Sequence, residues 1–99
     1  MKLTDRQLRI LEAAAAGKVH KPYPHFYYSF TLERRPSLAE MEALKALKLI
    51  TERADPDRGT GRNTETMEIT SVHYRVIVSD LGLSVLALFP PRKIERQHL

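Results

Sequence analysis

The chain has 99 residues, of which 42% are hydrophobic and 28% are charged, and its formal net charge is +4. This length and composition predict one globular domain and exclude a disordered chain. Because the chain has no cysteine, disulfides, thiol catalysis and thiolate metal sites are excluded, and a cytoplasmic location is expected. No apolar run approaches the ~20 residues of a membrane span, so we expect no membrane partner.

The positive charge is concentrated near the N-terminus. Residues 1–36 contain seven Lys and Arg against three Asp and Glu, whereas the rest of the chain carries equal numbers of each. A basic segment favours nucleic acid as a partner, because phosphate groups attract it. The neutral remainder of the chain weakens this indication.

The first predicted element is a helix over Asp5–Ala16. Thr4 is a suitable N-cap, and Gln7 stands three residues later, as a capping box requires. Apolar residues then recur at helical spacing, which predicts one face turned to the core. Gly17 is the expected stop, since glycine readily adopts the left-handed conformation that ends many helices.

Residues 18–36 are predicted to form a short hairpin, with a distorted helix as the alternative. Pro22 and Pro24 exclude a regular helix across Val19–His25, and a strand pattern of aromatic and β-branched residues follows them. Val19–Lys21 is expected to pair with this strand. We expect one alternating set to complete the core, namely Phe26, Tyr28 and Phe30. The side chains expected to stay exposed are those of Tyr23, His25 and Tyr27.

The second predicted helix begins after Ser37. Ser37 is its N-cap, Glu40 completes the capping box, and Pro36 prevents the helix from extending backwards. The helix is expected to run into Leu49-Ile50, followed by a strand at Thr51–Arg53. The residues expected to face the core are Leu38, Met41, Leu44 and Leu47. The outward face then consists of Ala39, Glu40, Glu42, Ala43 and Ala46, flanked by Lys45.

The rest of the chain predicts a long hairpin and a short helix. A polar segment over residues 55–63 contains two glycines and predicts the hairpin tip. In the returning strand, alternate residues are expected to share one face: Val72, Tyr74, Val76 and Val78. Ser79 caps a helix over Asp80–Leu88, which Pro90-Pro91 ends. We therefore predict a domain over residues 1–91 and a basic, flexible tail over residues 92–99.

Three segments of the chain follow one another in an order that is informative about the fold. Leu3–Glu12 is an opening helix, Leu44–Ile50 is a helix end that leads into a strand, and Tyr74–Leu86 is a strand followed by a helix. Together they resemble the winged helix-turn-helix family of bacterial and phage DNA-binding proteins. The last segment is similar to the family's strand and Leu-Thr-x-x-Gly-x-x-x-Leu motif. Its matching positions are Val78, Ser79, Gly82 and Leu86.

The resemblance implies an α+β winged-helix domain in which residues 18–36 replace the usual second helix. It also implies binding to double-stranded DNA, as a small transcriptional regulator or an accessory factor of a phage or mobile element. A homodimer fits this function, because one small domain covers little DNA. Arginines on the wing and before a helix N-terminus are suited to phosphate. The residues expected to contact DNA are Arg34, Arg35, Ser37, Lys45, Arg58 and Arg62.

A second hypothesis is a protein-interaction module that reuses this fold, such as a phage-encoded inhibitor of a host complex. Base reading favours Arg, Lys, Asn and Gln, whereas the outward face of the second helix carries two carboxylates that repel phosphate. Exposed aromatic side chains are also common in protein interfaces. The residues expected at such an interface are Tyr23, His25, Tyr27, Glu40 and Glu42.

No catalytic, metal or cofactor site is predicted. The sequence shows no nucleophile–base grouping and no long glycine-rich phosphate loop. The four histidines are scattered and lack the spacing of metal ligands. We therefore expect no enzyme activity, no metal and no cofactor.

Overall fold

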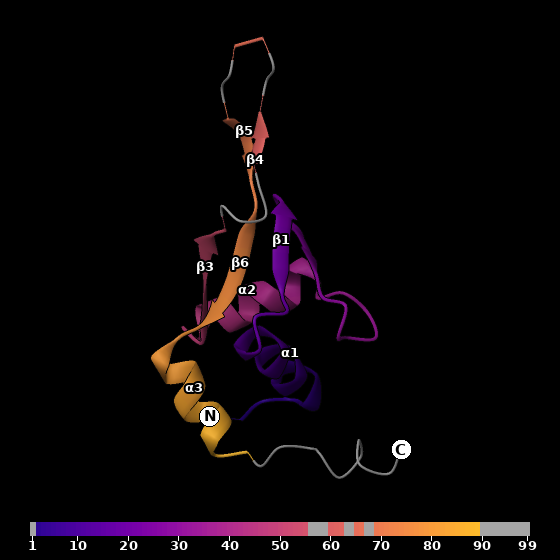
Figure 1. Ribbon diagram of the computed structural model, residues 1–99. Helices are drawn as coiled ribbons and strands as arrows, with labels where there is room; N and C mark the ends of the chain where they lie inside the picture. Colours follow the sequence, from indigo (N-terminus) through magenta and orange to yellow (C-terminus); the bar gives the residue numbers. More distant parts are fainter. Residues whose placement is uncertain (1, 56–59, 63–64, 67–68, 90–99) are drawn as a thin grey trace.

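The computed structural model describes residues 2–55, 60–62, 65–66 and 69–89, with the backbone alone for residues 60–62 and 69–71. These described residues form three helices and six strands (Figure 1). In chain order the elements are α1 (Asp5–Ala15), β1 (His20–Tyr23), β2 (Phe26–Tyr28), α2 (Leu38–Ala46), β3 (Ile50–Ala54), β4 (Thr60–Arg62), β5 (Ile69–Val72), β6 (Tyr74–Val78) and α3 (Asp80–Ala87). The predicted α+β class is confirmed. Pro90-Pro91 and the predicted tail lie outside the described residues.

Four strands form an antiparallel sheet in the order β2-β1-β6-β3. β3 and β6 pair from Ile50 opposite Val78 to Ala54 opposite Tyr74. β4 and β5 form a separate two-stranded hairpin. This hairpin lies between the end of β3 and the start of β6 in the chain, and it extends away from the three helices (Figure 1). The molecule therefore has a helical end, where the core lies, and a hairpin end.

Helix α1 forms as its sequence predicts. The Thr4 hydroxyl accepts a hydrogen bond from the Gln7 backbone amide, and the Gln7 side chain accepts one from the Thr4 amide. The helix ends at Ala15, one residue earlier than predicted, and Gly17 follows with a φ of 74°. The Lys18 amide then donates to the Ala13 carbonyl, as in a Schellman motif. Local signals therefore determine both ends of α1.

Residues 18–36 contain the predicted hairpin, formed by β1 and β2, but the expected core face of β2 is wrong. Tyr27 is buried, whereas Phe30 is 92% exposed and Phe26 and Tyr28 are only partly buried. Neighbouring residues of a strand point to opposite faces. Shifting the alternation by one residue therefore exchanges the buried and the exposed side chains. Tyr27 can be buried because Glu52 accepts a hydrogen bond from its hydroxyl. Phe30 lies beyond the end of the three-residue strand β2.

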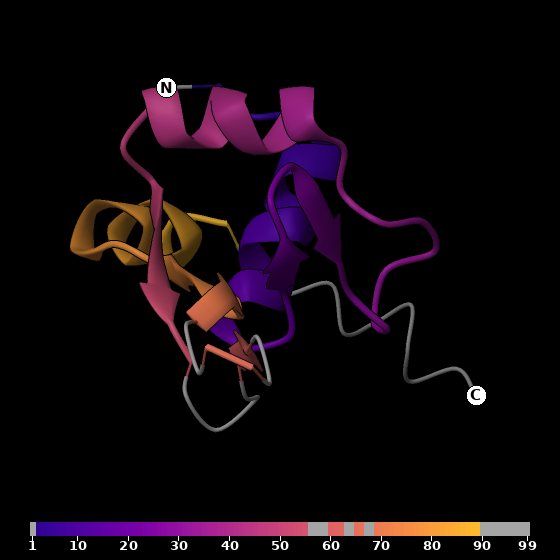
Figure 2. The ribbon, with the colours of Figure 1, turned by 90° about the horizontal axis from the view of Figure 1, so that it is seen from above.

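Helix α2 packs against the core through a narrow seam. Met41 and Leu44 are fully buried, but Leu38 and Leu47 are 41% and 38% exposed, so their prediction as core residues is wrong. The reason is length, because α2 has only nine residues and its middle alone reaches the core. Figure 2 shows α2 crossing beside the start of α1, where Arg6 contacts Glu40. The outer face of α2 is therefore more apolar than expected.

The core lies between the helices and the inner face of the sheet. It consists of buried residues from α1, α2, β6 and α3, together with Val19 just before β1, Tyr27, Leu49 and Ile50. Val76 and Val78 are buried as predicted. Val72, however, belongs to β5 and not to the four-stranded sheet, so the predicted single returning strand is interrupted at His73. The interruption separates the hairpin from the body of the domain.

Candidate functional site

The start of α2 is held by a cluster of side chains. Ser37 and Glu40 form the predicted capping box, in which each side chain accepts a hydrogen bond from the other's backbone amide. From α1, the Arg6 Nε donates to Glu40 Oε2 at 2.9 Å. Arg6 Nη2 also donates to the backbone carbonyls of Arg34 and Arg35, each at 3.2 Å. Arg6 therefore fixes the segment before α2 instead of adding free charge to the surface.

Glu40 is ionised and fully engaged in this cluster. The hydrogen bond from Arg6 is the main reason that the pKa of its carboxyl is lowered to about 2, with help from the Ser37 amide. Arg34 Nη2 lies 3.7 Å from Glu40 Oε2, although the Arg34 side chain remains largely exposed. A carboxylate already compensated by arginines repels phosphate weakly. The Arg34 side chain thus pairs with Glu40 at long range and remains accessible to a ligand, because it is largely exposed.

Arg34 and Arg35 border an open groove of about 420 Å³ between the β1–β2 turn and the start of α2. The Arg35 guanidinium carbon lies 4.5 Å from the centre of the Phe26 ring, a cation–π contact. His25 forms the turn with a φ of 63°, and both it and Tyr23 are exposed as predicted. The groove thus combines two guanidinium groups with an aromatic wall.

A second charged cluster joins α2 to the sheet, centred on Glu52 of β3. Lys45 Nζ lies 2.7 Å from Glu52 Oε2, Lys21 Nζ lies 3.0 Å from Glu52 Oε1, and the Tyr27 hydroxyl also donates to this carboxylate. Burial alone would raise the pKa of Glu52, but hydrogen bonds from Lys45, Tyr27 and Lys21 lower it to about 2. The cluster therefore holds a carboxylate anion with two ammonium groups. We name it the Glu52 cluster.

The Glu52 cluster changes the interpretation of two predicted site residues. Tyr27, expected to be exposed at a protein interface, is 1% exposed, so that expectation is wrong. Lys45, expected at phosphate, is paired with Glu52 and also lies 3.2 Å from Glu42. Its charge is already compensated by these two carboxylates. The exposed Glu42 is the predicted interface residue that remains on the outer face of α2.

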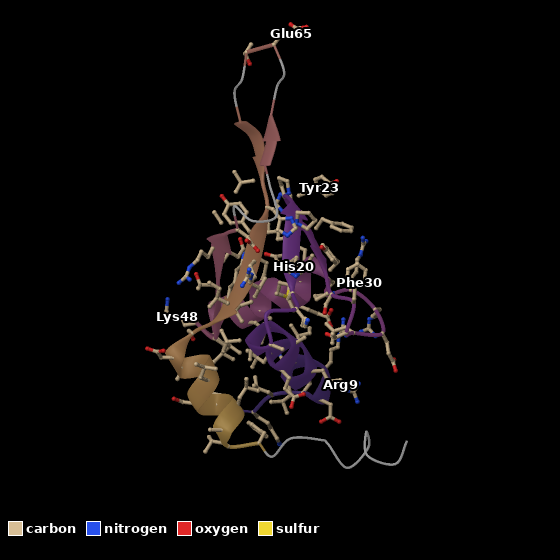
Figure 3. All side chains as sticks on the ribbon, viewed as in Figure 1. Arg9, His20, Tyr23, Phe30, Lys48 and Glu65 are labelled. Atoms are coloured by element: carbon tan, nitrogen blue, oxygen red, sulfur yellow. The ribbon has the colours of Figure 1, made fainter. Side chains whose placement is uncertain are left out.

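The end of α2 presents a cation that the sequence did not single out. The Lys48 amide donates to the Lys45 carbonyl and the Leu49 amide to the Leu44 carbonyl, which together form a Schellman motif. Lys48 occupies the left-handed position of this motif, with a φ of 61°, where glycine or asparagine is usual. Its side chain is exposed at the edge of the molecule, before the start of β3 (Figure 3). Lys48 therefore places an exposed cation at the C-terminal end of α2.

The two arginines predicted on the wing are Arg58 and Arg62. Arg58 lies outside the described residues, and of Arg62 only the backbone in β4 is described. Their predicted contacts with DNA stay predictions.

Among the described residues, no three potential ligands come together as a metal site. Within the same part of the chain, no helix is long and apolar enough to cross a membrane.

Comparisons of this chain with protein-family models, with curated proteins and with solved structures found no match. The function is therefore inferred from these residues and their geometry.

Proposed function

We propose that the chain is a small DNA-binding protein of the winged-helix type, acting as a transcriptional regulator or as an accessory factor of a phage or mobile element. The observation that carries this proposal is the topology. α2 leads directly into β3, the β4–β5 hairpin follows, and β6 returns between β3 and β1. A helix that leads through one strand of the four-stranded sheet into a projecting hairpin is the arrangement that the winged-helix resemblance implies for a recognition helix and wing.

The exposed cations around α2 support contact with the DNA backbone. Arg34 and Arg35 lie before its first turn and Lys48 follows its last turn, so positive charge flanks both ends of the helix. Between them the exposed face offers mainly alanine and leucine, with Glu42 as a charged member. Such a face reads few base edges, because base reading depends on hydrogen-bond donors and acceptors. We therefore propose binding dominated by phosphate contacts and tolerant of sequence.

Binding of the purified chain to a mixed-sequence duplex tests this proposal by fluorescence anisotropy at two salt concentrations, about 50 and 200 mM. We expect binding that weakens strongly with salt. Arg34→Ala and Arg35→Ala should each reduce the salt slope by about one unit, because each removes one phosphate contact. Lys18→Ala is the control, since Lys18 is an exposed cation at the far end of α1. Absence of binding at low salt would contradict the proposal.

Replacing Lys48 by glycine is expected to raise stability and to weaken DNA binding. Lys48→Gly should raise the free energy of unfolding by about 0.5–1 kcal/mol, because relief of the left-handed strain exceeds the added entropy of the unfolded chain. It should also weaken DNA binding and reduce its salt slope by about one unit. Urea denaturation and anisotropy measure the two effects. Lys48→Ala is the matched control, because it removes the charge and keeps the strain. Unchanged DNA binding in both variants would exclude Lys48 from the interface.

A protein-interaction module is the second candidate, favoured by the apolar outer face of α2. Leu38 and Leu47 are each more than a third exposed, and Tyr23 at the hairpin turn is 62% exposed. Exposed large apolar side chains are common in protein interfaces. This candidate becomes the first choice if the chain fails to bind duplex DNA at low salt. Tyr23→Ala should then weaken the complex with a protein partner while the arginine variants bind it normally.

A further inference from the structure

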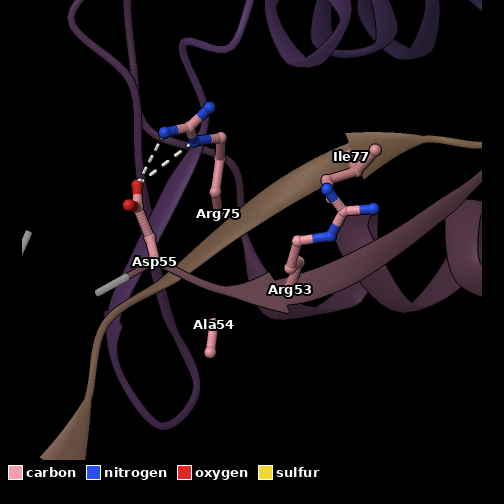
Figure 4. Close-up of a pocket in the computed structure, with 5 residues that line it drawn as sticks. All are labelled: Arg53, Ala54, Asp55, Arg75 and Ile77. Atoms are coloured by element: carbon pink, nitrogen blue, oxygen red, sulfur yellow. Dashed lines mark hydrogen bonds and ion pairs between the residues drawn. The ribbon is translucent and has the colours of Figure 1, made fainter. Parts of the chain in front are cut away.

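A hollow lies on the outer face of β3 and β6, opposite the face that carries the Glu52 cluster. Two adjoining cavities, of about 200 and 320 Å³, share Arg53, Arg75 and Ile77 as lining residues. Figure 4 shows these three side chains on the same side of the two strands. The larger cavity continues toward the end of α1 and toward Leu83 of α3. The hollow is therefore charged at one end and apolar at the other.

The charged end contains a cross-strand pair of arginines. Arg53 stands directly opposite Arg75 in the β3–β6 register, an arrangement that is unfavourable for like charges. Arg75 is compensated by Asp55, whose Oδ2 accepts hydrogen bonds from Nη2 at 2.9 Å and from Nε at 3.2 Å (Figure 4). The Asp55 side chain is only 4% exposed. Within the described residues, Arg53 forms no ion pair, so one guanidinium in this hollow lacks a counter-charge.

The apolar end offers surface to a short hydrocarbon chain. Ile77 follows Arg75 by two residues and so lies on the same face of β6. Leu83 of α3 is 51% exposed although it lines the cavity. Ala14 and Ala15 complete this wall from the end of α1. Covering these side chains would remove apolar surface from water, which is favourable.

We propose that this hollow binds a small organic monocarboxylate with an apolar chain. The carboxylate would pair with the Arg53 guanidinium, whose planar fork matches two carboxylate oxygens. The chain would lie against Ile77 and Leu83. One uncompensated guanidinium favours a monoanion over a phosphate dianion, and the apolar wall favours an amphipathic ligand over a small inorganic ion. This site goes beyond the proposed DNA binding and does not depend on it.

Titration with sodium octanoate tests the site, followed by isothermal calorimetry and by amide chemical shifts in two-dimensional NMR. We expect saturable shifts at Arg53, Ile77 and Leu83. Arg53→Gln should weaken octanoate binding about tenfold or more, because a charge-assisted bidentate pair is lost. This variant should fold normally, since it removes one member of a like-charge pair. Arg9→Gln, which removes an exposed arginine from α1, should bind octanoate like the wild type.

A variant at Leu83 and two smaller anions distinguish the contribution of the apolar wall from that of the Arg53 guanidinium. Leu83→Ser should weaken octanoate binding severalfold and leave the weaker binding of acetate unchanged, because acetate has no chain to contact Leu83. Inorganic phosphate should bind no better than acetate. The proposal is overturned if octanoate causes no shifts at these amides, or if Arg53→Gln binds octanoate as well as the wild type. Phosphate binding stronger than octanoate binding would also overturn it, because the site would then be a simple anion site.

Discussion

Glu52→Ala is expected to lower the free energy of unfolding by about 3–5 kcal/mol, because it leaves two partly buried ammonium groups and a buried hydroxyl without their shared acceptor. Lys21 and Lys45 both pair with Glu52, and the Tyr27 hydroxyl donates to it. Lys45 comes from α2, Lys21 from β1 and Tyr27 from β2, so the loss affects the contact between the helix and three strands. Urea denaturation followed by far-ultraviolet circular dichroism measures this change. Glu42→Ala is the control, because Glu42 contacts Lys45 from an exposed position.

Acid provides a second test of the same cluster. Its surroundings lower the pKa of Glu52 from 4.5 to about 2, so the folded state binds fewer protons than the unfolded state between these values. The stability that Glu52 contributes is therefore complete above about pH 5 and is lost as the pH falls through 4.5 toward 2. Glu40 behaves in the same way, since its pKa is also lowered to about 2.

Glu52→Gln should consequently lose less stability than the wild type when the pH is lowered from about 5 to 2. The glutamine amide cannot be protonated in this range, and Glu40 remains to give the residual slope. If the wild type and Glu52→Gln lose the same stability on acidification, the carboxylate of Glu52 does not hold the helix and the sheet together.

Gly82→Ala is expected to destabilise the domain by about 2–3 kcal/mol, the upper part of the range for overpacked sites. A Cβ atom on Gly82 would lie 2.4 Å from the Leu49 carbonyl oxygen and 2.5 Å from the Val78 Cγ1. The carbonyl cannot easily move away, because it accepts a hydrogen bond from the Ser79 amide at 2.9 Å. The Ser79 hydroxyl holds the same junction by donating to the Lys48 carbonyl at 2.7 Å.

Ser84→Ala is the matched control for Gly82→Ala. Ser84 is exposed in the same helix, so alanine there should leave stability unchanged or raise it by a few tenths of a kcal/mol through helix propensity. Both variants are compared by urea denaturation. A Gly82→Ala variant as stable as Ser84→Ala would mean that α3 does not pack closely on Leu49 and Val78.

The sequence alone determined the features that depend on short-range interactions. The starts of all three helices were predictable from Thr4, Ser37 and Ser79, since each side chain caps backbone amides within three residues. Gly17 likewise identified the end of α1, and two prolines indicated a hairpin in place of a helix. In the candidate site, the exposure of Tyr23 and His25 was predicted correctly, whereas that of Tyr27 was not. These signals require no knowledge of distant residues.

The tertiary structure alone decided which partners meet and which face of each element is buried. A strand of three residues carries too little pattern to show which of its faces is buried. Tyr27 is buried because Glu52 accepts a hydrogen bond from its hydroxyl, whereas Phe30 is exposed because it lies beyond the end of β2. Lys45 was predicted at phosphate, and only the packing of α2 against β3 sets its Nζ 2.7 Å from Glu52 Oε2. Arg53 and Arg75 are 22 positions apart, and only the β3–β6 register sets them opposite each other. Such contacts depend on how elements pack, and no local propensity specifies them.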